Sequence, residues 1–275
     1  MQVPPPQMDV NIGMKSNSAS DKAIVINKEK LALSIGSSEN LKVSYASGKT
    51  IDNKTITWKS SNPQIAAVNT SGKVTAKAPG RITVTASTKD GYKAESQVTV
   101  LFADVTDPSE FYYDYVYDMA EKGVVQGYND GTFGPYKNCN RAAVVTFLWR
   151  LSGKPEPKKK AKFKDMTGNG DFDNAISWAS EKGITTGWDD NTFRPWNTCN
   201  RAAVVTFLWR AAGKPEPKKK ALFSDLTGNT DFDKAISWAS ENGITTGWDD
   251  NTFRPWRDCN RLAIVSFLSR YEALK

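Results

Sequence analysis

Hydrophobic and polar residues follow two different patterns along this chain. Between residues 22 and 102, short alternating runs such as TITWKS, KVTAK and RITVTAST are separated by Asn-Pro, Ser-Gly, Pro-Gly and Asp-Gly turns. Alternation with a period of two and frequent turn residues is typical of strands with one buried face. We therefore predict a small antiparallel β-sandwich over residues 22–101, with Trp58, Ile82, Val84 and Ala86 directed into its core.

After residue 102 the period changes to that of a helix. In DFDNAISWASEKGI the apolar residues Phe172, Ala175, Ile176 and Ala179 recur at three- and four-residue spacing, and a glycine follows. This spacing predicts a short amphipathic helix that ends at Gly183. A second helix is expected in each unit after an asparagine N-cap, with glycine as the C-terminal stop in two units. These caps and stops are Asn140, Asn200, Asn260, Gly153 and Gly213.

The helical part is an internal repeat of 60 residues. The segment NCNRAAVVTFLWR at 138–150 returns as TCNRAAVVTFLWR at 198–210, and a third copy, DCNRLAIVSFLSR, begins at Asp258. Between the two helices of each unit lies a turn-rich loop, GYNDGTFGPY or GWDDNTFRPW. We predict a domain order of a flexible N-terminal arm (1–21), a β-sandwich (22–101) and three helix-loop-helix units (102–161, 162–221 and 222–275).

Composition excludes several classes of function. The 275 residues include no histidine, so catalysis by Ser-His-Asp or Cys-His groups and histidine metal sites are excluded. The three cysteines have no C-x-x-C partner and precede the helix caps, where we expect buried, inert thiols. We predict no cofactor and no bound metal. The sequence has no apolar stretch long enough for a membrane span, and its first 21 residues lack the apolar core of a signal peptide.

The net charge of +7 is concentrated before the repeats. Residues 1–103 hold 13 basic and 7 acidic residues, which leaves 24 basic and 23 acidic residues for 104–275. A nucleic-acid partner needs a concentrated basic face, and the local excesses in KPEPKKK at 154–160 and 214–220 are expected to be solvated linkers. We therefore predict no nucleic-acid partner.

Both parts resemble known families. TWKSSNPQIAAVNTSGKVTAKAPGRITVTAS at 57–87 resembles the signature of the group 2 bacterial immunoglobulin-like domain, and the likeness covers residues 24–101. Residues 102–275 resemble three tandem S-layer homology repeats, with an F-x-D start, a G-I-x-x-G helix end, a D-G-T-F-x-P loop and a T-R-A-E helix start. The resemblance implies a pseudo-threefold arrangement whose grooves hold the terminal, often pyruvylated, sugar of a secondary cell-wall polymer. The glutamate of T-R-A-E is replaced in every copy, by Ala143, Ala203 and Ala263.

The candidate carbohydrate site combines residue types that suit an anionic sugar. An arginine fork pairs with a carboxylate, an aromatic ring covers a sugar face, aspartate accepts from hydroxyls, and glycine allows close approach. Core packing remains the alternative for the ring residues, turn formation for the aspartates and bridging between repeats for the arginines. The candidate residues are Arg141, Arg201, Arg261, Gly127, Tyr128, Asp130, Gly187, Trp188, Asp190, Gly247, Trp248 and Asp250.

Three hypotheses for function remain open at this point. The first is a non-catalytic cell-wall adhesion protein at the bacterial surface, in which weak sites gain from multivalency. The second is a phage virion protein whose N-terminal arm or Ig-like domain attaches to the particle or to a surface-protein partner. The third is a protein–protein architecture whose grooves no longer bind sugar. Catalysis by adjacent loop aspartates such as Asp189 and Asp190 is disfavoured, because tandem copies are unlike a single catalytic pair.

Overall fold

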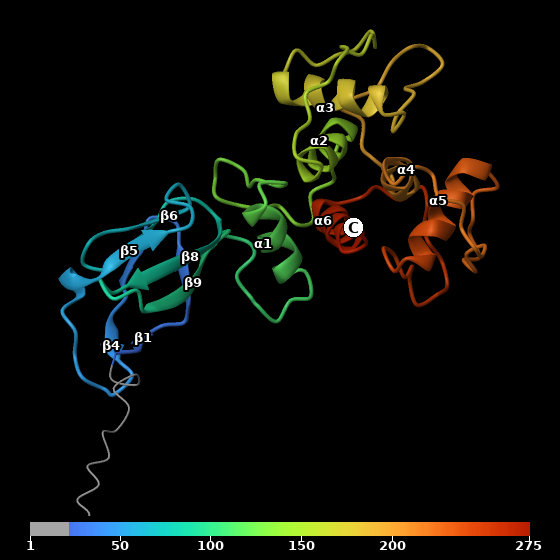
Figure 1. The fold of residues 1–275 in the computed structure, drawn as a ribbon. Coiled ribbons are helices and arrows are strands. Elements are labelled where there is room, and N and C mark those ends of the chain that lie inside the picture. The colour runs from blue at the N-terminus through green and yellow to red at the C-terminus, as the bar shows by residue number, and fades with distance from the viewer. Residues whose placement is uncertain (1–21) are drawn as a thin grey trace, which may run out of the picture.

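The computed structural model describes residues 22–275, so the predicted flexible arm at 1–21 lies outside the described residues. The described chain forms a β-sandwich followed by a helical domain, as predicted (Figure 1). The sandwich contains β1 (Ile24–Ile26), β2 (Lys30–Ser34), β3 (Ser38–Asn40), β4 (Val43–Tyr45), a 3-10 turn (Asn53–Thr55), β5 (Thr57–Ser60), β6 (Ala66–Val68), β7 (Lys73–Ala76), β8 (Gly80–Ser87) and β9 (Lys93–Leu101).

The sandwich is built from a four-stranded sheet, a three-stranded sheet and the β1–β4 pair. The larger sheet has the order β2-β9-β8-β5, and the smaller one has the order β3-β7-β6. Alternate residues of β8 are buried, and Ile82, Val84 and Ala86 point into the core as expected. Trp58 is only partly buried and packs at the edge of that core. The expectation of a purely antiparallel sandwich is wrong for one pair, because β2 runs parallel to β9.

Residues 102–275 contain six α-helices, two for each repeat. They are α1 (Tyr113–Glu121), α2 (Arg141–Leu151), α3 (Gly170–Glu181), α4 (Arg201–Ala211), α5 (Thr230–Glu241) and α6 (Arg261–Glu272). The predicted caps are confirmed: the side-chain oxygens of Asn140, Asn200 and Asn260 each accept a hydrogen bond from the backbone N–H three residues later. The stops at Gly153 and Gly213 have φ of 83° and 88°, values that a glycine adopts without strain.

The helix pairs that pack most closely cross the boundaries of the sequence repeat. Helix α2 of the first unit packs on α3 of the second, α4 packs on α5, and α6 returns to pack on α1. The inner helices α2, α4 and α6 also contact one another, and α1, α3 and α5 lie outside them (Figure 1). Each unit therefore completes its core with a helix from the next unit, which closes the three units into a ring.

A backbone ring at the centre reinforces this closure. The N–H of Cys139 donates to the carbonyl of Cys259, Cys199 donates to Cys139, and Cys259 donates to Cys199, at 2.9–3.0 Å. All three thiols are buried and unpaired, as expected. Burial raises the pKa of Cys139 to about 11 and that of Cys199 to about 12, so both thiols stay protonated near neutral pH.

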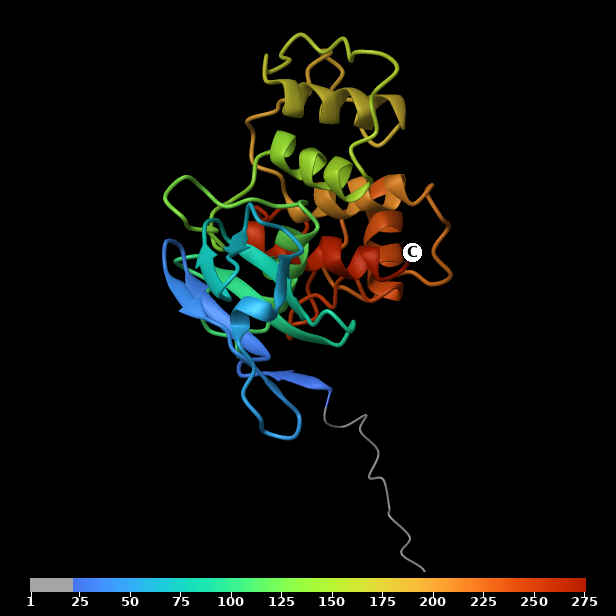
Figure 2. The same cartoon turned by 60° about the vertical axis from the view of Figure 1, so that its left-hand side comes forward.

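The sandwich and the first repeat are joined without a linker. Strand β9 ends at Leu101, and the next residue, Phe102, is fully buried in the helical core. Its N–H donates to the hydroxyl of Tyr117, which itself donates to the carbonyl of Val105. Arg81 on β8 adds two ion pairs, at 2.8 Å to Asp114 and 2.7 Å to Asp118 on α1. The turned view shows the sandwich lying against the first repeat, with α3 at the far end of the molecule (Figure 2).

Candidate functional site

The loop of each repeat is held by the aspartate of its own F-x-D start. In the second repeat both carboxylate oxygens of Asp165 accept backbone N–H groups, from Phe193 and Arg194 at 2.8 Å. Asp104 and Asp225 hold the other two loops in the same way. A carboxylate that accepts two backbone donors fixes the loop without help from a ligand. The F-x-D aspartates are therefore structural.

Each candidate arginine connects two repeats. Arg141 begins α2 in the first repeat, and its Nε donates at 2.9 Å to the carbonyl of Phe193 in the second. Arg201 makes the same bond to Phe253 of the third repeat, and Arg261 closes the ring by donating to Phe133 of the first. The arginines therefore bridge repeats, and what distinguishes them is how much of each guanidinium remains free.

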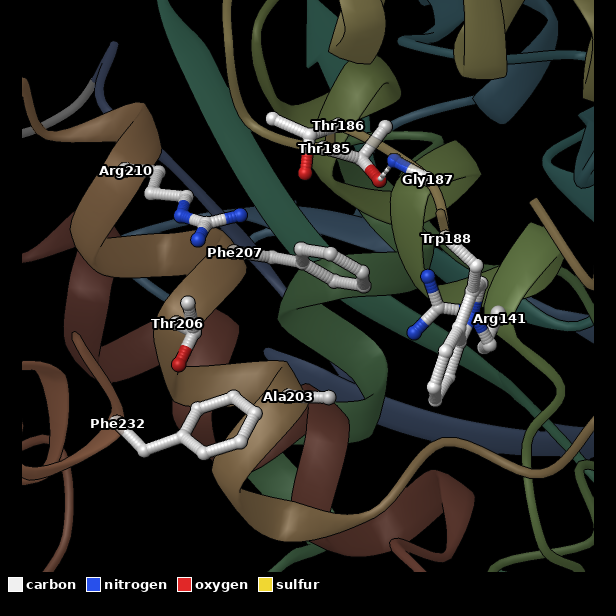
Figure 3. A pocket seen from close by; sticks show the side chains of 10 residues that line it. All are labelled: Arg141, Thr185, Thr186, Gly187, Trp188, Ala203, Thr206, Phe207, Arg210 and Phe232. Atoms are coloured by element: carbon white, nitrogen blue, oxygen red, sulfur yellow. Dashed lines mark hydrogen bonds between the residues drawn. The ribbon is translucent and has the colours of Figure 1, made fainter. Parts of the chain in front are cut away.

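A groove beside Arg141 carries the strongest candidate site (Figure 3). It has a volume of about 200 Å³, and in Figure 3 Arg141 and Arg210 flank Phe207 from opposite sides. We call it the Arg141 groove. Its lining residues are Arg141, Thr185, Thr186, Gly187, Trp188, Ala203, Thr206, Phe207, Arg210 and Phe232.

The Arg141 groove presents uncompensated positive charge. Within residues 22–275 the Nη1 and Nη2 atoms of Arg141 have no hydrogen-bond partner, so the fork remains free for a ligand. Burial lowers the pKa of Arg141, because the charged form has lost hydration. Arg210 pairs with Asp231 at 3.0 Å, but its buried Nε has no partner. Ala203 stands where the family pattern has glutamate, and no carboxylate from the described part of the chain lines the groove.

The other two arginines are less available. Arg201 is buried, with its guanidinium carbon 4.2 Å from the centre of the Trp248 ring, and its Nη2 lies 3.4 Å from the Thr245 hydroxyl. Burial lowers the pKa of Arg201 to about 10. Arg261 is also buried, and its Nη2 donates at 2.7 Å to the carbonyl of Gln126, in addition to the Nε bond. The capacity to bind an anion therefore falls from Arg141 to Arg201 to Arg261.

The candidate aspartates lie in the turns of the loops and not in the Arg141 groove. Asp190 accepts from both the N–H and the hydroxyl of Thr192, and Asp130 and Asp250 make the same pair of bonds. Hydrogen bonding to the Thr252 hydroxyl and to Arg254 lowers the pKa of Asp250 to about 2. These carboxylates are engaged in turn formation, which the sequence left open as the alternative.

The candidate glycines are explained by packing. A Cβ on Gly187 or on Gly247 would lie 2.3 Å from the ring of Phe163 or Phe223, and one on Gly127 would lie 2.6 Å from Phe102. The glycines thus make room for the phenylalanine of the F-x-D start. Of the ring residues, Trp188 is 48% exposed and Tyr128 is 42% exposed, whereas the helical residues Trp149, Trp178, Trp209 and Trp238 are buried.

Sequence reasoning missed Arg210 and the threonine pair of the Arg141 groove. Arg210 lies on the last turn of α4, and arginine recurs at the same place as Arg150 and Arg270. This 60-residue recurrence at a helix end was the available signal. Thr185 and Thr186 are not repeated in the first unit, where Val125 and Gln126 replace them. They do recur as Thr245 and Thr246 in the third unit, and this partial recurrence was the available signal.

Comparison with family models gives the two parts their names. The bacterial Ig-like domain (group 2) matches residues 22–100, and the S-layer homology domain matches residues 101–145, 162–205 and 222–263. This chain joins a bacterial Ig-like domain to three S-layer homology domains. The S-layer homology domains are the three helical repeats, so the Arg141 groove lies between the first two of them and the start of the third.

Curated relatives match about half or more of the chain. The chain is 28% identical over 155 residues to the cellulosome-anchoring protein of Acetivibrio thermocellus and 34% identical over 129 residues to the surface layer protein of Brevibacillus choshinensis. It is 26% identical over 203 residues to the amylopullulanase of Thermoanaerobacterium thermosulfurigenes. The matches cover 53%, 46% and 72% of this chain but only 34%, 11% and 11% of these relatives.

This chain has S-layer homology domains, and its relatives are named as anchoring and surface-layer proteins. Together these findings support a location at the cell surface and anchoring to the cell wall. One of these relatives, the amylopullulanase, is named as an enzyme, whereas the other two are named for anchoring or for the surface layer. Within residues 22–275 no helix is long and apolar enough to cross a membrane.

Proposed function

We propose that the three S-layer homology domains bind an anionic secondary cell-wall polysaccharide and that the Arg141 groove is the principal site. The observation that carries the proposal is the free guanidinium fork of Arg141 in a groove without a carboxylate. A bidentate pair between guanidinium and carboxylate is strong and geometrically specific, so a pyruvyl ketal or another acidic sugar substituent is a fitting ligand. Trp188 and the threonine hydroxyls offer an apolar ring and hydrogen-bonding groups for the attached sugar.

The electrostatics of the groove support an anionic ligand over a neutral one. Burial has removed hydration from Arg141, and an anion would compensate that loss where water is excluded. Arg210 adds a second positive group at the other side of Phe207. The Arg201 site retains part of this capacity, and two weak sites on one chain strengthen attachment to a repeating polymer.

A structural role of the arginines is the second candidate function, since each Nε bridges two repeats. In that case the grooves would bind no sugar, and the helical domain would serve as a rigid protein–protein unit. The two candidates predict different results with isolated cell walls.

The test is co-sedimentation of residues 1–275 with sacculi of Acetivibrio thermocellus and Brevibacillus choshinensis, before and after acid extraction of the secondary polymer. We expect the protein to pellet only with unextracted sacculi, and Arg141→Ala to stay in the supernatant. Lys159→Ala, which removes the same charge from the exposed linker, is the matched control and should pellet like the wild type. Circular dichroism confirms that both variants fold. Equal pelleting of wild type and folded Arg141→Ala would contradict the proposal.

A further inference from the structure

A second recess lies between the Ig-like domain and the first S-layer homology domain. It has a volume of about 370 Å³. Asn62, Ala78 and Pro79 line its Ig-like side, and Glu121, Gln126 and Tyr128 line the side of the first repeat. We call it the interdomain cleft. The two sides of the cleft are held together by the direct junction of β9 with Phe102 and by the Arg81 ion pairs. The cleft is therefore a fixed part of the fold.

The equivalent place in the third repeat has a different lining. There the preceding linker occupies the position of the Ig-like domain, and Lys219 and Lys220 line the recess. Glu241, the counterpart of Glu121, accepts a hydrogen bond from the backbone N–H of Lys218 at 2.8 Å. Glu121 has no such partner within residues 22–275, because no linker precedes the first repeat. The Ig-like domain therefore creates a cleft without lysines and leaves a carboxylate free in it.

The lining of the interdomain cleft suits an uncharged, hydroxyl-rich ligand. Among residues 22–275, Glu121 is the only charged residue that lines the cleft, which disfavours an anion. The Gln126 side chain and the Nδ2 of Asn62 have no protein partner within residues 22–275, so amide donors and acceptors are available to hydroxyls. The Tyr128 hydroxyl is likewise available, and Pro79 adds an apolar surface. Sugar rings combine hydroxyls with an apolar face in the same way.

The neighbouring arginine does not change this preference. Arg261 lies 4.9 Å from the centre of the Tyr128 ring, but both its Nε and its Nη2 are bonded to backbone carbonyls. At Arg141 the corresponding Nη2 is free. Arg261 of the third repeat is thus engaged in bonds to the first repeat at the point where the Ig-like domain adds neutral hydrogen-bonding groups.

We propose that the interdomain cleft is a second carbohydrate site, which binds an uncharged sugar residue of the wall glycan while the Arg141 groove binds an acidic one. This inference rests on the proposed function for the source of its ligand. It assigns the Ig-like domain a direct part in recognition. The two sites would recognise an uncharged and an acidic sugar residue of one polymer.

The test separates the two sites by ligand charge. Wall polysaccharide is treated with mild acid to remove acid-labile anionic substituents, and the oligosaccharides that no longer bind an anion exchanger are titrated into residues 1–275 by calorimetry. We expect Ala78→Trp, which fills the cleft, to weaken binding of this neutral fraction about tenfold or more, and Gln126→Ala to weaken it about threefold to tenfold. Thr246→Ala, the equivalent position in the third repeat, and Lys159→Ala in the exposed linker should bind the neutral fraction like the wild type.

A second measurement, on the wild-type protein, reports binding in the cleft directly and does not depend on how Ala78→Trp folds. In the wild type, the side-chain amide resonances of Asn62 and Gln126 should shift as the neutral fraction is added. Absence of these shifts at saturation, or unchanged binding by folded Ala78→Trp, overturns the inference. If the neutral fraction fails to bind while the untreated polymer binds through Arg141, the inference fails and the proposed function stands. If the untreated polymer fails to bind, the proposed function fails.

Discussion

The Arg141 groove and the region around Arg261 arise from the same repeated sequence but offer different chemistry. Both place an arginine at the start of an inner helix, with its Nε on the loop carbonyl of the next repeat. At Arg141 the fork stays free and threonines line the groove, whereas at Arg261 the fork is bonded to Gln126 and the Ig-like domain forms the neighbouring surface. In one copy of the sequence unit the arginine thus keeps a free guanidinium fork, and in another the fork is bonded, depending on what lies beside it.

The largest expected difference between the two arginines is in their contribution to the stability of the folded protein. Arg261→Ala leaves one buried and one partly buried carbonyl without their donor, and we expect it to lower the free energy of unfolding by about 2–4 kcal/mol. Arg141→Ala removes one such bond from a less buried residue, so the expected loss is about 1–2 kcal/mol. Denaturant unfolding of both variants measures the difference. Equal losses would mean that the two arginines have the same structural role.

The second prediction concerns affinity for the anionic polysaccharide. Here the larger loss is expected for Arg141→Ala and the smaller one for Arg261→Ala. Arg141→Ala should weaken binding of the untreated anionic polysaccharide about 30-fold, because a bidentate charged pair is lost. For Arg261→Ala, measured at a temperature where it is folded, we expect a change of no more than about twofold, since its fork is already occupied. Calorimetric titration compares the two variants. A larger loss for Arg261→Ala would reverse the assignment of the principal site.

A smaller effect follows from restoring the acid of the family pattern. Ala203 lines the Arg141 groove, and Ala203→Glu places a carboxylate beside Arg141 and Arg210. The new charge competes with the ligand anion, so affinity for the anionic polysaccharide should fall about fivefold. Ala143→Glu, at the equivalent position of the first repeat, is the matched control and should leave the affinity unchanged. An equal loss in the control would show that net charge alone is responsible.

The smallest effect tests what the three repeats share. Burial raises the pKa of Cys139 to about 11 from an ordinary value near 9, and the other two thiols shift in the same direction. The folded state therefore holds protons that the unfolded state releases, and stability present below pH 9 is lost between about pH 9 and 11. We expect the melting temperature to fall about 3 °C further between about pH 8 and 9.5, where this loss begins, in the wild type than in a Cys139→Val variant. Parallel curves for the two proteins would contradict this account of the thiols.

The local features of the fold were predictable from sequence because each depends on nearby residues. The asparagine caps at Asn140, Asn200 and Asn260 act within one helical turn, and the alternation of Ile82, Val84 and Ala86 records which face of β8 is buried. The parallel pairing of β2 with β9 was missed, because alternation indicates a buried face but not the direction of the neighbouring strand.

The candidate site was predicted in part. The arginines were found by their recurrence, and the open alternative of bridging between repeats is confirmed for all three. The predicted roles of the aspartates and glycines as ligand contacts remain without support, since turn bonds and phenylalanine packing account for them. Arg210 was missed because its place beside Arg141 depends on contact between different repeats.

By itself the sequence determined the units: a β-sandwich, three copies of two capped helices, and an arginine at the start of each inner helix. These depend on local propensity and periodicity, which the chain carries in every copy. The tertiary structure alone decided that α6 packs on α1, that the fork of Arg141 is free while that of Arg261 is bonded, and that the Ig-like domain borders the first repeat. The reason is that identical units meet different neighbours once the ring closes, and the neighbours determine which polar groups remain available.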